Sequence, residues 1–69
     1  MLVKTLDKNE ITINKDDYKR VGFGLDEDGS HYVHFETGLN SVLHLTVEYN
    51  EMIRVMKLYI NGLEEWQTH

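Results

Sequence analysis

The chain has 69 residues, the size of one domain near the lower limit for a fold that stabilises itself. It contains no cysteine, so disulfides and thiolate metal sites are excluded. Seven Lys and Arg against twelve Asp and Glu give a net charge of −5, which argues against direct binding to the phosphate backbone of a nucleic acid.

The apolar residues are spread along the chain and not gathered in one run. No segment approaches the ~20 consecutive apolar residues of a membrane helix. The first ten residues contain no apolar stretch typical of a signal peptide. With no proline, internal repeat or low-complexity segment, nothing indicates a linker. We expect residues 1–69 to form a single cytoplasmic domain that does not contact a membrane.

The N-terminal segment predicts a short hairpin. MLVKTL and EITIN are two strand-like runs, and the turn between them contains Asn9, a residue type that tolerates the left-handed conformation. The next stretch, NKDDYKR, fits either a wide turn or one helical turn capped by Asn14. The sequence leaves these alternatives open, and with them the number of strands in residues 1–17.

The middle of the chain predicts a second hairpin, whose register follows from polarity. YKRVGFGL and SHYVHFET flank DEDG, in which Glu27 and Asp28 would be the corners of a type I turn and Gly29 the left-handed bulge residue. Leu25 then opposes His31, and nearly all apolar side chains share one face, whereas a shift by one residue would mix the faces. This register directs Leu25, Val33 and Phe35 inward, and it directs Tyr32, His34 and Glu36 outward, opposite Gly24, Gly22 and Arg20.

The last third predicts a strand followed by a helix. SVLHL is a short strand with Leu43 and Leu45 inward. From residue 47 to 66 the apolar residues recur with the helical period, and Thr46 is a suitable N-cap. The predicted fold class is therefore α+β: a small antiparallel meander of four to five strands with one C-terminal α-helix packed on one face.

The stretch LDEDGSHYVHFE suggests a calcium loop, but its spacing does not fit one. Counted from Asp26, an EF-hand loop needs glycine at the sixth position and glutamate at the twelfth. The sequence has His31 and Thr37 there. A solvated acidic hairpin turn explains the three acids better.

The histidines raise the question of zinc. His31 and His34 point to opposite faces if they lie on one strand. His34 and His44 share a face if their strands are neighbours, with Glu36 as a third ligand, but a structural zinc site needs four. We expect no metal and no cofactor, and keep a metal- or small-ligand-binding module built on His34, His44 and Glu36 as an alternative function.

Two glycines lie inside a predicted strand, in GFG. They fit no phosphate-binding loop, because no helix follows them. Either the rings of Tyr32 and His34 cover the backbone of Gly24 and Gly22, or the four residues form a flat patch for a partner, and the two alternatives are compatible.

No residue set indicates catalysis. Ser30 and Ser41 lack a motif that would activate a nucleophile, and paired acids such as Asp16 and Asp17 have no neighbour that would raise a pKa. We expect a protein that is not an enzyme.

The predicted helix carries an apolar arc wider than the ~100° that packing on one sheet requires. One edge of this arc is rich in the residue types that interface cores favour. We therefore predict a homodimer whose interface contains Met52, Val55, Tyr59 and Trp66.

No Lys or Arg occurs between Val21 and Ile53, whereas six acids do. Negative potential is therefore expected at one end of the molecule, and the leading hypothesis is a small acidic protein that binds another protein. In its sharper form the hypothesis is an inhibitor that mimics phosphate and blocks a nucleic-acid-acting enzyme, as small phage-type antagonists of nucleases do as a class. A structural subunit of a larger assembly is the other alternative. The predicted partner-binding residues are Asp26, Glu27, Asp28, Tyr32, His34 and Glu36.

Overall fold

The computed structural model describes residues 1–38 and 40–60 of the chain. In this part the predicted α+β fold is confirmed, with antiparallel strands followed by one α-helix. The strands form two sheets and not one, a β1–β2 hairpin and a three-stranded sheet in the order β3–β4–β5. The elements are β1 (Leu2–Lys4), β2 (Glu10–Thr12), the 3₁₀ turn η1 (Lys15–Asp17), β3 (Arg20–Leu25), β4 (His31–Glu36), β5 (Val42–Val47) and α1 (Tyr49–Ile60).

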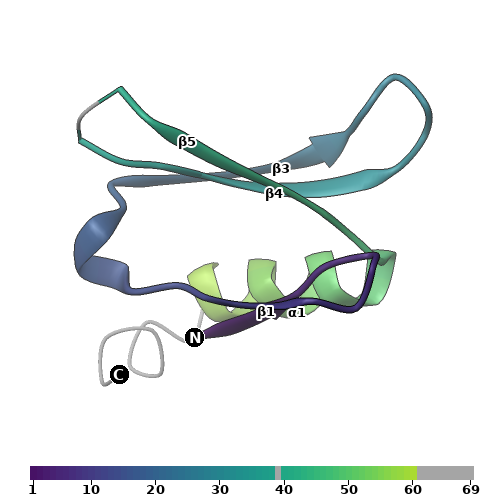
Figure 1. Cartoon of the computed structure of the whole chain (residues 1–69), viewed down its shortest axis with the longest axis horizontal. Coiled ribbons are helices and arrows are strands. Elements are labelled where there is room, and N and C mark those ends of the chain that lie inside the picture. Colours follow the sequence, from purple (N-terminus) through teal and green to yellow (C-terminus); the bar gives the residue numbers. More distant parts are fainter. Residues whose placement is uncertain (39, 61–69) are drawn as a thin grey trace.

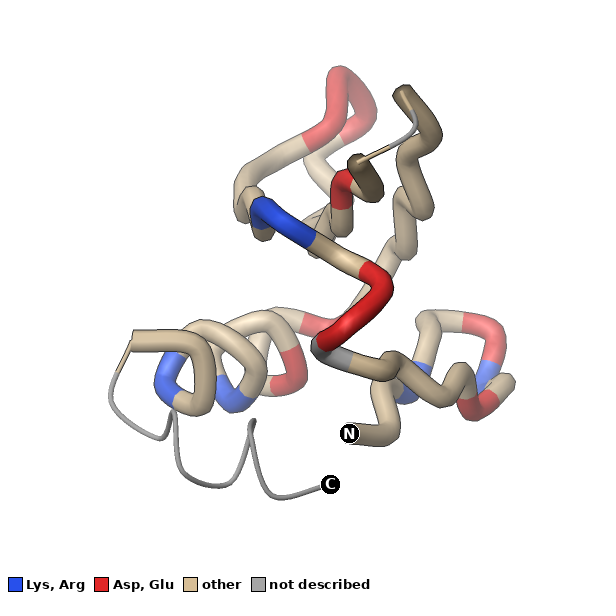
Figure 2. The backbone as a smooth tube through the Cα atoms, turned by 90° about the vertical axis from the view of Figure 1, so that its left-hand side faces the viewer, with Lys and Arg blue, Asp and Glu red and all other residues tan. Residues whose placement is uncertain are grey.

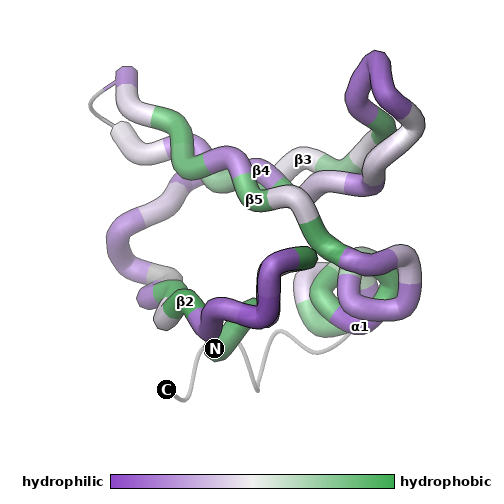
Figure 3. Tube along the Cα trace, turned by 45° about the vertical axis from the view of Figure 1, so that its right-hand side comes forward, coloured by the Kyte–Doolittle hydropathy of each residue, from purple (hydrophilic) through white to green (hydrophobic). Residues whose placement is uncertain are grey.

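The three-stranded sheet forms one layer of the molecule. Helix α1 and the β1–β2 hairpin form the second layer and lie against the same face of that sheet, as two perpendicular views show (Figures 1 and 2). We call this face the inner face. Hydrophobic and hydrophilic residues alternate along β4 and β5 (Figure 3), the pattern of strands with one buried face. The core between the layers consists of Val3, Ile13, Val33, Phe35, Leu45, Val47, Met52 and Val55.

Strand β4 is central and pairs with β3 in the register that polarity predicted. Leu25 lies opposite His31, and Arg20 lies opposite Glu36. Val33 and Phe35 are fully buried, as expected. Leu25 lies on the inner side of the sheet by this register, but it is not buried: 63% of its surface is exposed. It is the last residue of an edge strand, and His31 opposite it is itself only half-buried.

Among the described residues, three loops are closed by the same kind of backbone hydrogen bond, between the first and the fifth residue of a five-residue segment. The N–H of the first residue donates to the carbonyl of the fifth in residues 5–9, 26–30 and 37–41, at 2.8, 2.8 and 2.9 Å. The fourth residue has positive φ each time: Lys8 at 72°, Gly29 at 86° and Asn40 at 62°. The predicted bulge at Gly29 is therefore confirmed. In the first hairpin the left-handed residue is Lys8 and not Asn9, because Lys8 occupies the fourth position of this loop.

The ambiguous stretch after β2 contains one 3₁₀ turn, at residues 15–17. Asn14 Oδ1 accepts a hydrogen bond from the N–H of Asp16 at 3.4 Å, so the alternative of a helical turn capped by Asn14 is the one observed.

Helix α1 begins later than predicted. The proposed N-cap, Thr46, belongs to β5, where its carbonyl accepts the N–H of Leu6 at 2.8 Å. Val47 is buried in the core, which keeps the chain extended to that point. The carbonyl of Glu48 accepts a hydrogen bond from the N–H of Met52 at 3.0 Å, so Glu48 takes the capping position. The predicted end of the helix at residue 66 lies outside the described residues.

Candidate functional site

The three-stranded sheet has a second face, on the side opposite α1. We call it the outer face. In the part of the chain that the structure describes, no helix or strand lies over it (Figure 1). Because side chains alternate along a strand, it receives the residues that the inner face does not. These are Arg20, Gly22 and Gly24 from β3, Tyr32, His34 and Glu36 from β4, and Val42, His44 and Thr46 from β5.

Aromatic rings lie close over the two glycines of β3. A Cβ built on Gly24 would lie 2.8 Å from Tyr32 Oη and 3.0 Å from Tyr32 Cζ. A Cβ on Gly22 would lie 3.4 Å from the ring of His34. The rings of Tyr32 and His34 therefore cover the backbone of the two glycines, which was the first alternative left open by the sequence. The rings lie against the sheet, so the surface they form is shallow.

The rings of Tyr32, His34 and His44 contact one another in what we call the outer cluster. Their centroids are separated by 4.5 Å between Tyr32 and His44, and by 6.1 Å for each of the other two pairs. His34 and His44 lie directly opposite each other on β4 and β5, so the sheet itself brings them together. Side chains held this way present rigid aromatic area, which protein interfaces favour.

Each histidine of the outer cluster has a carboxylate beside it. His44 Nε2 lies 3.3 Å from the Asp26 carboxylate, and His34 Nε2 lies 3.8 Å from Glu36 Oε1. Glu36 also pairs with Arg20 at 3.3 Å. Among residues 1–38 and 40–60, no three His, Asp or Glu side chains gather as a metal-ligand group. The three residues of the alternative hypothesis share the outer face, and His34 lies beside Glu36, but the nearest carboxylate of His44 is that of Asp26 and Glu36 also pairs with Arg20.

The turn between β3 and β4 carries Asp26, Glu27 and Asp28, which we call the acidic turn. The Asp28 carboxylate accepts the backbone N–H of Ser30 at 2.9 Å. This bond, and then one from the Ser30 hydroxyl, lowers the pKa of Asp28, which favours the charged form of the carboxylate. Figure 2 shows the Asp and Glu residues of this turn (red) at one end of the sheet, away from Lys and Arg.

The other three acids between Val21 and Ile53 have Lys or Arg partners from outside this segment. Glu36 pairs with Arg20, Glu48 pairs with Lys8 at 3.0 Å, and Glu51 pairs with Arg54 at 2.8 Å. No described Lys or Arg forms an ion pair with the acidic turn. Of the acids between Val21 and Ile53, those of the acidic turn are therefore the ones left to produce the expected negative potential, because the fold brings cations to the other three.

The predicted dimer residues of α1 are placed differently from the prediction. Met52 and Val55 are buried in the core of the chain itself, with exposed fractions of 8% and 0%. Tyr59 packs against Phe23, with ring centroids 6.2 Å apart, and Trp66 lies outside the described residues. The prediction that Met52 and Val55 belong to a dimer interface on the helix was therefore wrong, because the core of the same chain buries both. The apolar arc of α1 is wide because it faces two surfaces, the inner face of the sheet and the β1–β2 hairpin.

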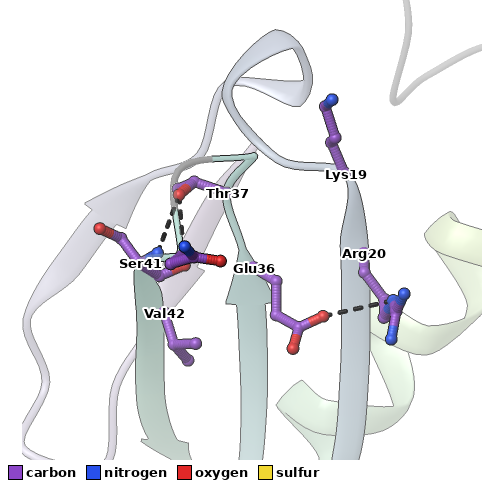
Figure 4. A pocket seen from close by; sticks show the side chains of 7 residues that line it. Lys19, Arg20, Glu36, Thr37, Ser41 and Val42 are labelled. Atoms are coloured by element: carbon purple, nitrogen blue, oxygen red, sulfur yellow. Dashed lines mark hydrogen bonds and ion pairs between the residues drawn. The ribbon is translucent and has the colours of Figure 1, made fainter.

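Sequence reasoning missed a shallow hollow of about 430 Å³ at the end of the outer face distant from the acidic turn. Figure 4 shows the Arg20–Glu36 ion pair and the contacts between Thr37 and Ser41 within it. Lys19 extends along its rim over Gly38, where an added Cβ would lie 2.9 Å from Lys19 Cε. Lys19 and Arg20 therefore lie at the start of β3, and the acidic turn follows its other end. Its lining residues are Lys19, Arg20, Glu36, Thr37, Asn40, Ser41 and Val42.

Comparison with known proteins gives no relative from which the role of these residues could be inferred. No family model, curated protein or solved structure shows significant similarity to the chain. Within the described residues, the single α-helix is neither long nor apolar enough to cross a membrane.

Proposed function

We propose that the chain is a small, non-catalytic module that binds another protein through the outer cluster and the acidic turn. The observation that carries this proposal is the outer cluster itself: aromatic rings fixed against a sheet face that no described element covers. A cytoplasmic setting, expected from the sequence, is part of the proposal, and fractionation of the source cells tests it.

The packing of the outer cluster suits recognition of a flat apolar partner surface. Tyr32 and His34 are already ordered against Gly24 and Gly22, so a partner immobilises few new rotamers when it binds. The glycines keep the neighbouring strand free of side chains, which lets a partner approach the rings closely. Buried aromatic anchors of this kind supply most of the binding free energy in typical interfaces.

The acidic turn specifies the charge of the partner. Glu27 and Asp28 are exposed, and no described Lys or Arg neutralises them. A partner with Lys or Arg beside its apolar contact would gain from these carboxylates in association rate and in specificity. The phosphate-mimic hypothesis is the strong form of this preference. Among the acids between Val21 and Ile53, those of the acidic turn are the ones without a described Lys or Arg partner. The form we propose is therefore the blocking of a local basic site on a nucleic-acid-acting enzyme, and not coverage of a duplex-length groove.

The test is affinity capture with the immobilised chain from lysate of its source cells, using matched variants. We expect Tyr32→Ser to abolish capture of the specific partner and Glu27→Gln/Asp28→Asn to weaken it. The amide at position 28 preserves an acceptor for the Ser30 N–H, so the turn is kept. Asp16→Asn/Asp17→Asn, which changes the net charge equally elsewhere, should leave capture intact. Equal loss in both charge variants would reduce the effect to net charge and refute the assigned surface.

Salt dependence separates phosphate mimicry from apolar recognition. A partner bound mainly through the acidic turn should be released steeply as ionic strength rises, because exposed charges are screened. A partner bound mainly through the outer cluster should be retained. Salt-insensitive capture that depends on Tyr32 would support the binding module and exclude the mimic.

A further inference from the structure

The two edges of the three-stranded sheet differ. Along β5, the carbonyl of Thr46 is engaged by the N–H of Leu6 in the first hairpin loop. Along the free side of β3, none of the residues that the structure describes forms a strand pair. The sheet therefore ends at β3 with an unpaired backbone edge.

The backbone groups that point to this edge can be identified. In an antiparallel ladder, residue pairs alternate between hydrogen-bonded and non-hydrogen-bonded. The N–H of Asp26 donates to Ser30 at 2.8 Å, and the register continues without interruption from that pair. Even-numbered residues of β3 are therefore bonded to β4, and the N–H and C=O groups of Val21, Phe23 and Leu25 point outward.

The edge lacks the devices by which edge strands normally avoid pairing. Between Arg20 and Asp26 there is no charged residue and no proline. Gly22 and Gly24 add no side-chain bulk on the outer face. At the end of the strand, Leu25 exposes 63% of its surface. An unprotected edge of this kind is a template for a further strand.

We propose that β3 pairs with β3 of a second copy of this chain, antiparallel and centred on Phe23. The charges argue for this partner, because β3 begins with a cation, Arg20, and is followed by an anion, Asp26. Two-fold pairing about Phe23 sets Arg20 of each copy opposite Asp26 of the other. It also joins outward-pointing backbone groups to each other: Val21 opposite Leu25, and Phe23 opposite Phe23.

Neighbouring registers lose this complementarity. A shift that keeps the hydrogen-bond alternation moves the axis to Gly22 or Gly24, and sets Arg20 opposite Gly24 or Asp26 opposite Gly22. In the register centred on Phe23, the exposed Leu25 meets Val21 of the second copy on the inner face. The predicted homodimer is thus moved from α1, where Met52 and Val55 are buried, to the β3 edge.

The pairing goes beyond the proposed function and does not depend on it. It joins two outer faces into one six-stranded surface with an outer cluster on each half. Glu27 and Asp28, at the corners of each acidic turn, are not part of the paired segment and stay available.

Hydrogen exchange of backbone amides, followed by NMR at several protein concentrations, tests the proposal at single-residue level. We expect the amides of Val21, Phe23 and Leu25 to become protected as concentration rises, in step with dimer formation in sedimentation equilibrium. The amides of Gly22 and Gly24, bonded to β4, should be protected at all concentrations. A monomer at every concentration would overturn the proposal. So would a dimer without added protection at the three outward amides, or protection independent of concentration, which would mean that the chain covers its own edge.

Variants give a second, independent readout. Leu25→Lys puts a charge at the edge and should abolish the dimer, whereas Leu2→Lys, at a residue 51% exposed in β1, should not. Arg20→Asp and Asp26→Arg should each weaken dimerisation by about tenfold, since the two-fold axis counts each substitution twice. The double variant Arg20→Asp/Asp26→Arg should restore it. Failure of the double variant to restore a dimer, with the fold retained by circular dichroism, would refute the register.

Discussion

The ring of Tyr32 rests on the backbone of Gly24 so closely that a Cβ on this glycine would lie 2.8 Å from Tyr32 Oη. The equivalent contact one row along the sheet, between His34 and Gly22, leaves 3.4 Å. The two glycines thus differ in how closely an aromatic ring packs on them. Gly24 is required by the ring above it, whereas Gly22 leaves room for a methyl group.

We therefore expect Gly24→Ala to destabilise the fold by about 1 kcal/mol, because the added methyl forces the Tyr32 ring off the sheet. Gly22→Ala should be neutral or slightly stabilising, since alanine lowers the entropy of the unfolded chain. Urea denaturation of both variants measures the difference. Equal stability of the two variants, with the Tyr32–His44 ring contact unchanged by NMR, would show that the ring adjusts freely.

A second prediction concerns metal binding by the histidines of the outer face. His34 and His44 oppose each other, but their nearest carboxylates lie in different directions, at Glu36 and Asp26. A zinc ion needs its nitrogen ligands at about 2.0–2.1 Å, with three or four ligands converging on it. We expect the melting temperature to be unchanged by a chelator or by added Zn²⁺, since binding to the folded state alone would raise it. Stabilisation by Zn²⁺ that is lost in His34→Gln would contradict this prediction and favour the metal-binding alternative.

The ion pair between Glu51 and Arg54 links the helix to the first strand. Glu51 accepts the N–H of Lys4 at 2.8 Å, and Arg54 donates to the carbonyl of Leu2 at 2.5 Å. The hydrogen bond from Arg54 lowers the pKa of Glu51 below its ordinary value of 4.5, against the opposing effect of burial, and the Lys4 N–H lowers it further. The same hydrogen bond raises the pKa of Arg54.

We expect Glu51→Gln to lose about 1 kcal/mol of stability at pH 7, a value kept low because solvent reaches the pair. A carboxylate with a lowered pKa in the folded state stabilises the protein fully above its unfolded-state pKa, and this contribution is lost as pH falls through the folded-state pKa. The gap between wild type and Glu51→Gln should thus be constant above about pH 5 and close at lower pH. Denaturation at a series of pH values measures it. Glu48→Gln, which removes the exposed pair with Lys8, should lose less at pH 7, and a gap that persists at acidic pH would refute the assignment.

The parts of the fold that could be predicted from the sequence are those fixed by local pattern. The register of β3 and β4 follows from the alternation of Val21, Phe23, Val33 and Phe35 together with a turn ending in Gly29, and both act within about 20 residues of chain. The two-layer arrangement could not be predicted this way. It depends on contacts such as Leu6 with Thr46 and Lys4 with Glu51, which join distant segments and leave no periodic signature.

The same limit explains how the candidate site changed. In the sequence, no Lys or Arg lies among the acids between Val21 and Ile53, but in the fold Lys8, Arg20 and Arg54 reach three of them from outside that segment. The outer cluster was easier to predict, because opposing pairs on neighbouring strands are fixed by register. The helix surface predicted for a dimer was inferred from the width of an apolar arc, but the chain's own core buries that arc at Met52 and Val55.

The left-handed residue of the first hairpin is Lys8 and not Asn9, and this difference leads to the last prediction. Lys8 holds φ at 72° in the loop position that Gly29 and Asn40 occupy in the other two loops. A side chain in this conformation costs about 1–2 kcal/mol, which glycine avoids, although glycine also makes the unfolded chain more flexible.

Lys8→Gly removes that strain together with an exposed ion pair to Glu48 that contributes at most about 1 kcal/mol. Lys8→Ala removes the same ion pair and keeps the strain, so it is the matched control. We expect Lys8→Gly to be more stable than Lys8→Ala by about 1 kcal/mol in urea denaturation. If the two variants unfold at the same urea concentration, the left-handed residue is not a source of strain in this loop.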